Sequence, residues 1–417
     1  MEAIVEQTRA IEWESVDISI HQTEEPVIAA EILHVDIAGP LETLQVAEVE
    51  CLIVFWWKDY PVGQVRQSGD PGRSIALKPL VESSVDTEVL RLAQQAVERE
   101  RSQTVPDDLV VSVVICTRDR PGELARCLAS LRTQTRVPDQ VVVVDNASSD
   151  GRTHEVVVKA EAIYVREDRS GLDFARNAGV RAASGHIIVY TDDDVCLHPR
   201  WLERMVNAFD DDHIMAVTGM VLPAELETEA QMFFEEYWSF GRGYRPIVFD
   251  RDFFKLDQTV GCPVWEIGAG ASMAFRRTII DRVGLFDERL GVGQAGCSED
   301  SEFWHRVLTH GWQCRYEPGA VVFHHHRREM AGLRKQIFFY MRGHVVALLV
   351  QFQRSKNIGN LGRAFITLPW SYLRRLIRRE FGTERKENRV LMQEIGGYCS
   401  GLKFYFLPPR SKKRVQE

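Results

Sequence analysis

Three consecutive carboxylates follow an apolar run in the segment HIIVYTDDDVC, where Asp192, Asp193 and Asp194 stand directly after a strand-like stretch. Like charges this close repel one another, and burial increases the repulsion, so such carboxylates stay protonated unless positive charge compensates them. Two interpretations are open. The run is either a solvated loop or helix N-terminus, where Asp is favoured, or a cation site.

A second group of carboxylates lies in SEDSEFWHRVL, which contains Glu299 and Asp300. The apolar residues that follow recur at helical spacing, which predicts a helix with one buried face and these carboxylates in its first turn. Either they cap this helix, or they are held there for chemistry.

Three histidines follow a further apolar stretch in VVFHHHRR, beginning at His324. Neutral histidine is the commonest transition-metal ligand, so this segment is a metal site, a solvated turn, or both.

The elements that must position these groups follow an alternating pattern from Val110 onward. The runs VVSVVIC, VPDQVVVVDN, AIYVRE and HIIVYTD predict strands, and LDFARNAGVRAA and the segment after Pro121 predict helices. Strands that alternate with helices of this length indicate a parallel α/β sheet. Ligands bind such sheets at the carboxyl ends of the strands, and TRDR, DNASSD and DDD stand at those ends. This placement favours a functional interpretation of the acidic run.

Two flanking regions have a different character, and they divide the chain into three predicted domains. Residues 1–105 form an N-terminal β-rich module plus linker, in which VAEVECLIVFWW and PVGQVRQ predict strands and TEVLRLAQQAVERERSQ predicts a helix or linker. Residues 106–328 form the α/β domain. Residues 329–417 form a basic helical extension.

The extension carries most of the positive charge of the chain. Residues 327–417 contain 20 Lys and Arg against 6 Asp and Glu, a net charge of +14, which leaves −23 for the rest of a chain whose total is −9. In LRKQIFFYMRGHVVALLVQFQRSKN and FITLPWSYLRRLIRREF, apolar and basic residues alternate, as in an interfacial amphipathic helix on an anionic membrane. The alternative is a helical hairpin packed on the α/β domain with a solvated basic face.

Composition excludes several classes of protein. The overall charge gives no reason to expect nucleic acid as a partner. The eight cysteines form no CxxC pair, so neither a structural zinc site nor a redox motif is indicated. The N-terminus is acidic without an apolar core, and the longest apolar run is short and interrupted by charge, so we expect no signal peptide, no transmembrane helix and a cytoplasmic location.

Six segments, in order, resemble the nucleotide-sugar-dependent glycosyltransferases of family 2, which have the GT-A fold. They lie between about residues 110 and 328 and read SVVICTRDRPGELARCLASL, VVVVDNASSDG, RSGLDFARNAGVRAASGHIIVYTDDD, GAGASMAFRR with VGLFDERLG, SEDSEFWHRVLTHGW and PGAVVFHHHR. The resemblance implies a GT-A domain, Rossmann-like with a mostly parallel central sheet. It also implies an inverting transfer of a sugar from a nucleotide-diphosphate sugar to an acceptor hydroxyl.

The resemblance implies a divalent cation, Mn²⁺ or Mg²⁺, bridging the diphosphate of the donor. Its metal ligands correspond to Asp192, Asp194 and His324, with His326 as a second choice for the histidine. The donor-binding positions correspond to Thr117, Arg118, Asp145, Arg169, Arg176, Asp192 and Asp193. For Asp145 a local turn-capping role stays open, and for the two arginines at 169 and 176 a surface ion pair stays open.

On the acceptor side, the resemblance assigns the catalytic base to Asp300 and a supporting contact to Glu299. Trp265 and Glu266, before a Gly-rich turn, and Ser272, where family members often have Asn, are expected to face the acceptor. Packing in the core is the alternative for Trp265. The acceptor is predicted to be a glycan or a lipid-linked sugar in surface polysaccharide or glycolipid assembly.

Two rival functions remain from the residues alone. A nucleotidyltransferase or phosphotransferase also uses Asp clusters and cations, but the chain has no GxxxxGK[ST] phosphate loop. A catalytically silent binding partner within a synthase complex would be expected to lack the DxD pattern or the base, and both are present.

Overall fold

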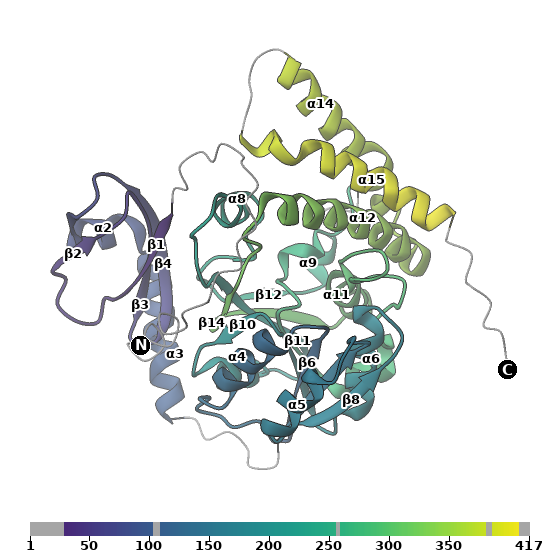
Figure 1. Cartoon of the computed structure of the whole chain (residues 1–417), viewed down its shortest axis with the longest axis horizontal. Coiled ribbons are helices and arrows are strands. Elements are labelled where there is room, and N and C mark those ends of the chain that lie inside the picture. Colours follow the sequence, from purple (N-terminus) through teal and green to yellow (C-terminus); the bar gives the residue numbers. More distant parts are fainter. Residues whose placement is uncertain (1–28, 103–108, 256–258, 381–385, 408–417) are drawn as a thin grey trace.

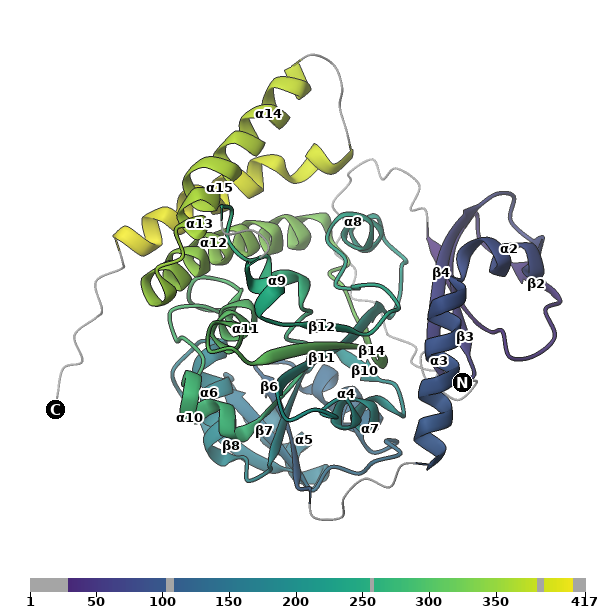
Figure 2. The same cartoon turned by 180° about the vertical axis from the view of Figure 1, so that it is seen from behind.

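A computed structural model describes residues 29–102, 109–255, 259–380 and 386–407 of the 417-residue chain. It shows a small β-rich unit, a central α/β body and a group of C-terminal helices (Figures 1 and 2). The N-terminal segment on which the absence of a signal peptide was predicted lies outside the described residues.

The α/β body is built on a nine-stranded sheet with the order β10-β14-β11-β13-β9-β6-β7-β8, in which β12 pairs with β14. Six strands run in the same direction, and β10, β12 and β13 run against them. The mostly parallel α/β sheet predicted from the sequence is therefore confirmed. The strands are β6 Val111–Thr117, β7 Gln140–Asn146, β8 Ile163–Glu167, β9 Ile187–Asp192, β10 Val195–Leu197, β11 Ile214–Pro223, β12 Ile247–Phe249, β13 Ser272–Arg276 and β14 Gln313–His324.

Both faces of the parallel strands are buried, which explains why their sequences are continuous apolar runs. In β6, Val114 belongs to one core cluster and Val113 and Ile115 belong to the other. Helix α6 packs on the first face, and α4, α5 and α7 pack on the second. The helices of the body are α4 Pro121–Leu131, α5 Arg152–Lys159, α6 Leu172–Ala182, α7 Trp201–Asn207, α8 Glu229–Tyr237, α9 Arg251–Lys255, α10 Ile280–Val283 and α11 Glu299–Thr309.

The parallel register brings the ends of three strands together. Thr117 of β6 pairs with Asp145 of β7, and the neighbouring Cys116 pairs with Asp192 of β9. The polar residues after these strands therefore meet at one edge of the sheet, as the sequence predicted.

The N-terminal unit has its own sheet and its own apolar core. Within β3, Ile53 and Phe55 face this core, whereas Leu52 and Val54 join a core cluster of the α/β body. Burial on both faces accounts for the uninterrupted apolar run of this strand. The elements are β1 Ala30–Asp36, β2 Thr43–Val46, β3 Glu50–Trp57, β4 Tyr60–Ser68, β5 Arg73–Ala76, α2 Leu77–Ser84 and α3 Thr87–Ser102.

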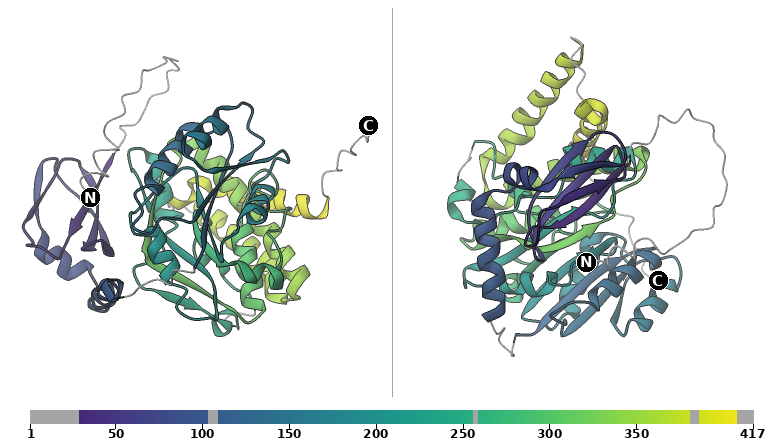
Figure 3. Two further views of the ribbon diagram at one scale, coloured as in Figure 1. Left: turned by 90° about the horizontal axis from the view of Figure 1, so that it is seen from below. Right: turned by 90° about the vertical axis from the view of Figure 1, so that its left-hand side faces the viewer.

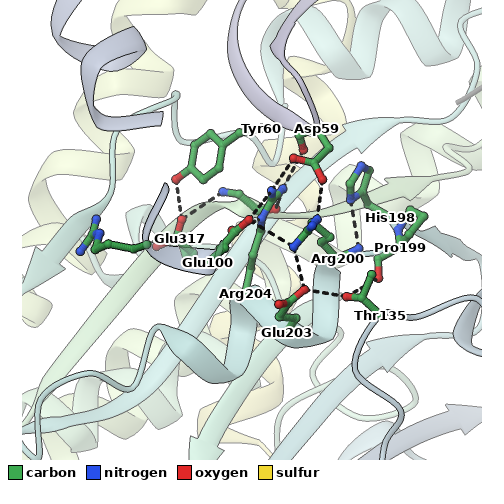
Figure 4. A network of polar contacts seen from close by, with 12 residues as sticks. Asp59, Tyr60, Glu100, Thr135, His198, Pro199, Arg200, Glu203, Arg204 and Glu317 are labelled. Atoms are coloured by element: carbon green, nitrogen blue, oxygen red, sulfur yellow. Dashed lines mark hydrogen bonds and ion pairs between the residues drawn. The ribbon is translucent and has the colours of Figure 1, made fainter. Parts of the chain in front are cut away.

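The N-terminal unit lies beside the α/β body (Figure 3), and a network of ion pairs joins the two (Figure 4). Arg204 of α7 is 3% exposed and contacts Glu100 at 2.6 Å and Asp59 at 2.8 Å. The hydroxyl of Tyr60 donates to Glu317 of β14 at 2.6 Å. Because a buried arginine loses its hydration, it requires both carboxylates, and the network therefore fixes how the two parts meet.

The C-terminal region is helical throughout its described residues. Helix α12 (Met330–Ser355) crosses the α/β body, and α13 (Ile358–Gly362), a π-helical turn (η3, Arg363–Thr367) and α14 (Leu368–Glu380) follow as one continuous helical stretch. Helix α15 (Leu391–Phe406) then returns along α12, and α14 and α15 stand out from the body (Figure 1). In the described part of the chain, every helix is too short or too polar to cross a membrane.

For the basic extension, one of the two predicted alternatives was a helical hairpin packed on the α/β domain. Helix α12 agrees with this alternative, because Val345, Leu348 and Leu349 are buried. The division into domains at residues 105 and 328 stays a prediction.

Candidate active site

The acidic run lies where β9 ends, and it approaches the histidine segment at the end of β14. Asp192, Asp194 and His324 each offer one ligand atom, and these atoms lie within 4.8 Å of one another. Nε2 of His324 is 3.4 Å from Oδ1 of Asp194. Carboxylate oxygens and an imidazole nitrogen at this spacing fit a divalent cation such as Mn²⁺ or Mg²⁺.

Asp193 is not a member of this group and is held by protein side chains. The hydroxyl of Thr117 donates to Asp193 at 2.6 Å, and Arg120 contacts Asp193 at 3.0 Å and Asp194 at 2.9 Å. Arg120 was not among the predicted site residues, although it belongs to the same TRDR motif as Arg118. Its position two residues beyond Arg118, in the turn that leads into α4, was the only sequence signal for it.

The charges of this cluster are unequal. Burial, and then the charge of Asp194, raises the pKa of Asp192 to about 7 and that of Asp193 to about 6. Burial acts on Asp194 in the same direction, but His324 and Arg120 outweigh it and lower the pKa of Asp194. Asp194 is thus the carboxylate held most firmly in the charged form that a cation requires.

Polar contacts link His324 through His326 to Glu235 of α8. Nδ1 of His324 lies 3.1 Å from Nδ1 of His326, and Nε2 of His326 lies 3.4 Å from Glu235 of α8. His326 is 6% exposed and lies behind His324. This order agrees with the choice of His324 over His326 as the metal ligand, since a partner on the second nitrogen fixes the orientation of a ligating imidazole.

A cavity of about 450 Å³ adjoins the acidic group. It contains Asp192, Arg176, Glu299 and Asp300, and it extends beneath the C-terminal helices. The remaining lining residues come from α6, the segment after α8, the Gly-rich turn with Trp265 before it, the loop before α11, the first turn of α11, α12, the η3–α14 stretch and α15. They are Leu172, Trp238, Phe240, Arg242, Trp265, Gly268, Ala269, Gly270, Ala271, Val292, Gly296, Cys297, Ser298, Ser301, Tyr340, Met341, His344, Arg363, Leu368, Ser371, Tyr372, Arg375 and Glu394.

A buried ion pair forms the floor of this cavity. Arg176 of α6 is 3% exposed and donates to Glu299 at 2.5 Å. Burial raises the pKa of Glu299, and the charge of Arg176 only partly opposes this effect. Arg176 is therefore a cavity residue rather than part of a surface ion pair.

Asp300 lies beside this pair and is held by the Gly-rich turn. The backbone N–H of Gly270 donates to Oδ2 of Asp300 at 2.8 Å. A methyl group at Gly270 would lie 2.6 Å from Nη2 of Arg176 and 3.2 Å from Oδ2 of Asp300. Only glycine lets the backbone approach both charged groups this closely.

The first turn of α11 does not use the expected capping arrangement. Ser298 occupies the N-cap position in a left-handed conformation, with φ 69°, and its side chain makes no capping hydrogen bond. Glu299 pairs with Arg176 and Asp300 bonds to Gly270. These contacts point the carboxylates toward the cavity and not only toward the helix end.

Besides Thr117 and Asp193, three further predicted donor-binding residues lie outside the cavity lining. Asp145 accepts from the backbone of Ser148 and from Tyr164 and Arg166 at 2.7 to 3.0 Å, so its alternative local role is realised. Arg118 bonds to Ser170 at 2.5 Å.

Arg169 is the third of these residues, and it pairs with Glu167 at 2.8 Å. It is the surface ion pair that the sequence left open as an alternative. Roles of Arg118, Asp145 and Arg169 toward a nucleotide stay predictions.

The predicted acceptor-side residues separate into three environments. Trp265 lines the cavity, with the guanidinium of Arg363 4.0 Å above its ring. Glu266 is exposed and does not line the cavity. Ser272 is fully buried, and its hydroxyl accepts a hydrogen bond from the indole N–H of Trp201 at 2.9 Å.

Ser272 and Glu266 therefore lie outside the cavity lining, and their roles toward an acceptor stay predictions. Strand β13 turns the side chain of Ser272 into the core, and the short helical turn η1 (Val264–Glu266) points Glu266 to solvent.

Sequence reasoning missed the contribution of the C-terminal helices to the cavity. Arg363, Tyr372 and Arg375 come from the η3–α14 stretch, and His344 comes from α12. Arg242 adds a further guanidinium, which donates to the backbone carbonyls of Ser239, Gly241 and Trp265. The basic pattern of the extension was visible in the sequence, but it was assigned to a surface and not to the site.

The α/β fold thus brings Asp192 of a cation-competent acidic group and a second pair of carboxylates, Glu299 and Asp300, to one cavity. Residues 112–284 match the family model of glycosyl transferase family 2. This match lies within the segment, about residues 110 to 328, in which the motifs resemble that family.

Characterised relatives align beyond this segment. The chain is 26% identical over 296 residues to a pre-mycofactocin glycosyltransferase of Mycobacterium tuberculosis, covering 67% of this chain and 58% of the relative. It is 25% identical over 332 residues to a chondroitin synthase of Escherichia coli, covering 74% of this chain and 45% of the relative. The chain thus spans about half the length of these relatives.

A solved structure is also similar. The mannosyltransferase PcManGT of Pyrobaculum calidifontis, in complex with GDP-Man and Mn²⁺, aligns with a TM-score of 0.48 at 18% identity. The alignment covers 77% of this chain and 95% of that one.

Proposed function

We propose that this protein transfers a sugar from a nucleotide-diphosphate sugar to an acceptor hydroxyl with inversion at the anomeric carbon. One observation supports the proposal: Asp192, which belongs to the acidic group at the end of β9, and Asp300 of α11 line the same cavity. Transfer needs a charge-neutralising site for the diphosphate and a base for the acceptor. A molecule bound in this cavity would reach both Asp192 and Asp300.

Asp192, Asp194 and His324 would hold the cation. When bound, Mn²⁺ or Mg²⁺ would neutralise charge on the departing diphosphate. Thr117 and Arg120 position Asp193 and Asp194, and Arg176 supplies a buried positive charge on the same side of the cavity.

Asp300 would act as the base. The acceptor hydroxyl gives its proton to Asp300, its oxygen bonds to the anomeric carbon, and the bond from that carbon to the diphosphate oxygen breaks. Because the acceptor attacks in one step from the face opposite the leaving group, the configuration inverts. A general base is typically worth ~10²–10⁴ in rate, and Glu299 would keep Arg176 in place beside it.

The acceptor would be a glycan or a lipid-linked sugar. One relative, 26% identical over 194 residues, is a glucosyl-dolichyl phosphate glucuronosyltransferase of Haloferax volcanii, and another is the chondroitin synthase. Surface polysaccharide or glycolipid assembly, with the protein in the cytoplasm or peripheral to the membrane, is consistent with these names.

The proposal is tested by measuring nucleoside diphosphate released from a panel of nucleotide sugars with Mn²⁺ or Mg²⁺. Asp194→Ala and Asp300→Asn are run beside the wild-type protein. We expect turnover of one donor that requires the cation and falls at least ~10²-fold in each variant. Asp168→Asn, an exposed position close to Arg166, is the matched control and should keep full activity.

Binding separates the possible failures. Asp300→Asn should still bind the nucleotide in a cation-dependent manner, whereas Asp194→Ala should not. Wild-type binding without turnover points to an acceptor missing from the assay. Neither turnover nor cation-dependent binding would refute the transferase and leave the silent binding protein.

A further inference from the structure

The helical stretch η3–α14 has two apolar faces, and only one of them is covered. Ala364, Leu368 and Tyr372 are 0 to 8% exposed and pack against α12 and α15. On the other side, Ile366 is 70% exposed and Trp370 is 58% exposed.

The exposed face continues along the helix. Leu373 and Ile377 are each 46% exposed, and together with Ile366 and Trp370 they follow the three- and four-residue spacing of one helical stripe. This stripe is hereafter the outer stripe.

Exposed apolar surface is concentrated in this part of the molecule. Of the fifteen large apolar side chains that are exposed in the described part of the chain, nine lie between residues 358 and 407. A monomer that exposes scattered apolar residues needs no explanation, but a contiguous stripe marks a contact surface. Helix α14 also stands out from the α/β body, together with α15 (Figures 1 and 2).

Positive charge flanks the outer stripe and indicates the partner. Arg374 and Arg378 are exposed and follow Trp370 and Leu373 along the same helix. An apolar stripe with tryptophan and flanking arginines fits the boundary between the headgroups and acyl chains of an anionic bilayer.

The opposite face of the same helix lines the cavity through Leu368, Ser371, Tyr372 and Arg375. A bilayer on the outer stripe therefore lies one helix diameter from the cavity wall, about 10 Å. An acceptor held in that bilayer by a lipid would be presented beside the proposed catalytic groups.

We propose that the outer stripe docks the protein on an anionic bilayer surface and so presents membrane-held acceptors to the cavity. The second half of this statement rests on the proposed function, and the docking itself does not. Binding is therefore measured without donor or acceptor.

The experiment is flotation of the full chain with phosphatidylcholine vesicles and with vesicles of 70% phosphatidylcholine and 30% phosphatidylglycerol. We expect at least tenfold tighter binding to the anionic vesicles. The triple variant Ile366→Ser, Trp370→Ser and Ile377→Ser should bind them at least about tenfold more weakly, because three exposed apolar side chains lose their burial in lipid. Val137→Ser with Val158→Ser, which changes valines 76% and 59% exposed elsewhere, is the matched control and should bind as the wild type does.

The charge is tested separately. Arg374→Gln with Arg378→Gln should weaken binding to anionic vesicles about 25-fold, the equivalent of ~2 kcal/mol, and leave binding to neutral vesicles unchanged. Arg251→Gln with Arg282→Gln, at exposed positions of the α/β body, controls for net charge. All variants should keep the circular dichroism spectrum and the thermal unfolding midpoint of the wild type, which shows that they fold and does not depend on the proposed function.

Two outcomes overturn the docking proposal. One is that the wild type, the triple variant of the outer stripe and the Arg374→Gln, Arg378→Gln variant all bind anionic vesicles equally. The other is a concentration-dependent dimer in size-exclusion chromatography that the triple variant abolishes, without vesicle binding, because the stripe is then covered by a second copy of this chain.

Discussion

A single added methyl group at Gly270 tests the arrangement of the site without removing any charged group. In Gly270→Ala, the new Cβ would lie 2.6 Å from Nη2 of Arg176, and ordinary contact begins at 3.4 Å, so the guanidinium must move by about 0.8 Å. Arg176 is 3% exposed and held by Glu299 at 2.5 Å, so it has little room to move. The methyl group also presses on Asp300, whose Oδ2 would lie 3.2 Å away.

A displacement of about 1 Å in a catalytic site costs up to ~10²-fold in rate. We therefore expect kcat of Gly270→Ala to fall by about 10 to 100-fold, with the KM for the donor changed little, because the cation group at Asp194 is untouched. The assay is steady-state release of nucleoside diphosphate, with thermal unfolding measured in parallel. The matched control is Gly151→Ala, where a methyl group would meet nothing within 4 Å.

The result that refutes this reasoning is wild-type kcat in a folded Gly270→Ala protein. Arg176 and Asp300 would then be structural residues at the edge of the cavity, and the base would have to be sought elsewhere. A fall in both Gly270→Ala and Gly151→Ala would instead show a general loss of folded protein.

Three further predictions concern metal binding, assembly and pH. Asp194→Ala should abolish Mn²⁺ binding measured by calorimetry, whereas a cation held elsewhere would leave the isotherm unchanged. Arg204→Met should lower the free energy of unfolding in urea by about 3 kcal/mol, because Glu100 loses a buried partner. A loss below ~1 kcal/mol would show that the network does not join the N-terminal unit to the α/β body. Burial lowers the pKa of His305 to about 3 in the folded protein, whereas the pKa in the unfolded chain is about 6.5. Between these two pH values the unfolded chain binds a proton that the folded protein does not. The free energy of unfolding should therefore fall by about 1.4 kcal/mol for each pH unit below 6.5. His305→Phe should flatten that slope in urea titrations at pH 7 and pH 5, and an unchanged slope would contradict the assignment.

The strands of the α/β body could be predicted from the sequence because each is buried on both faces and therefore continuous in apolar residues. The four predicted strands from Val110 to Asp192 correspond to β6, β7, β8 and β9. The antiparallel strand β13 could not be placed between β9 and β11 in the same way, because pairing between strands distant in sequence leaves no periodic signal.

The candidate site was predictable where one motif carries both position and chemistry. The Asp192–Asp194 run and His324 converge as expected, because each follows directly on a strand that ends at the same edge of the sheet. Arg120 was missed because a flexible arginine in a turn can point in several directions, and only the fold selects one. The orientation of Ser272 could not be read from the sequence, because alternate residues of a strand face opposite sides and only the fold decides which side meets the cavity.

By itself, the sequence determined the α/β class, the family, and the carboxylates and histidine that could hold a cation, because these depend on local periodicity and on residue type. Only the tertiary structure decided that Arg176, Glu299 and Asp300 share one cavity with Asp192, since the three come from α6 and α11, more than a hundred residues apart. It also decided that the basic extension closes that cavity with one face of a helix and exposes the other. Both are consequences of packing between distant segments, in which the free energy of burial selects one face of each helix and leaves the rest to solvent or to a partner.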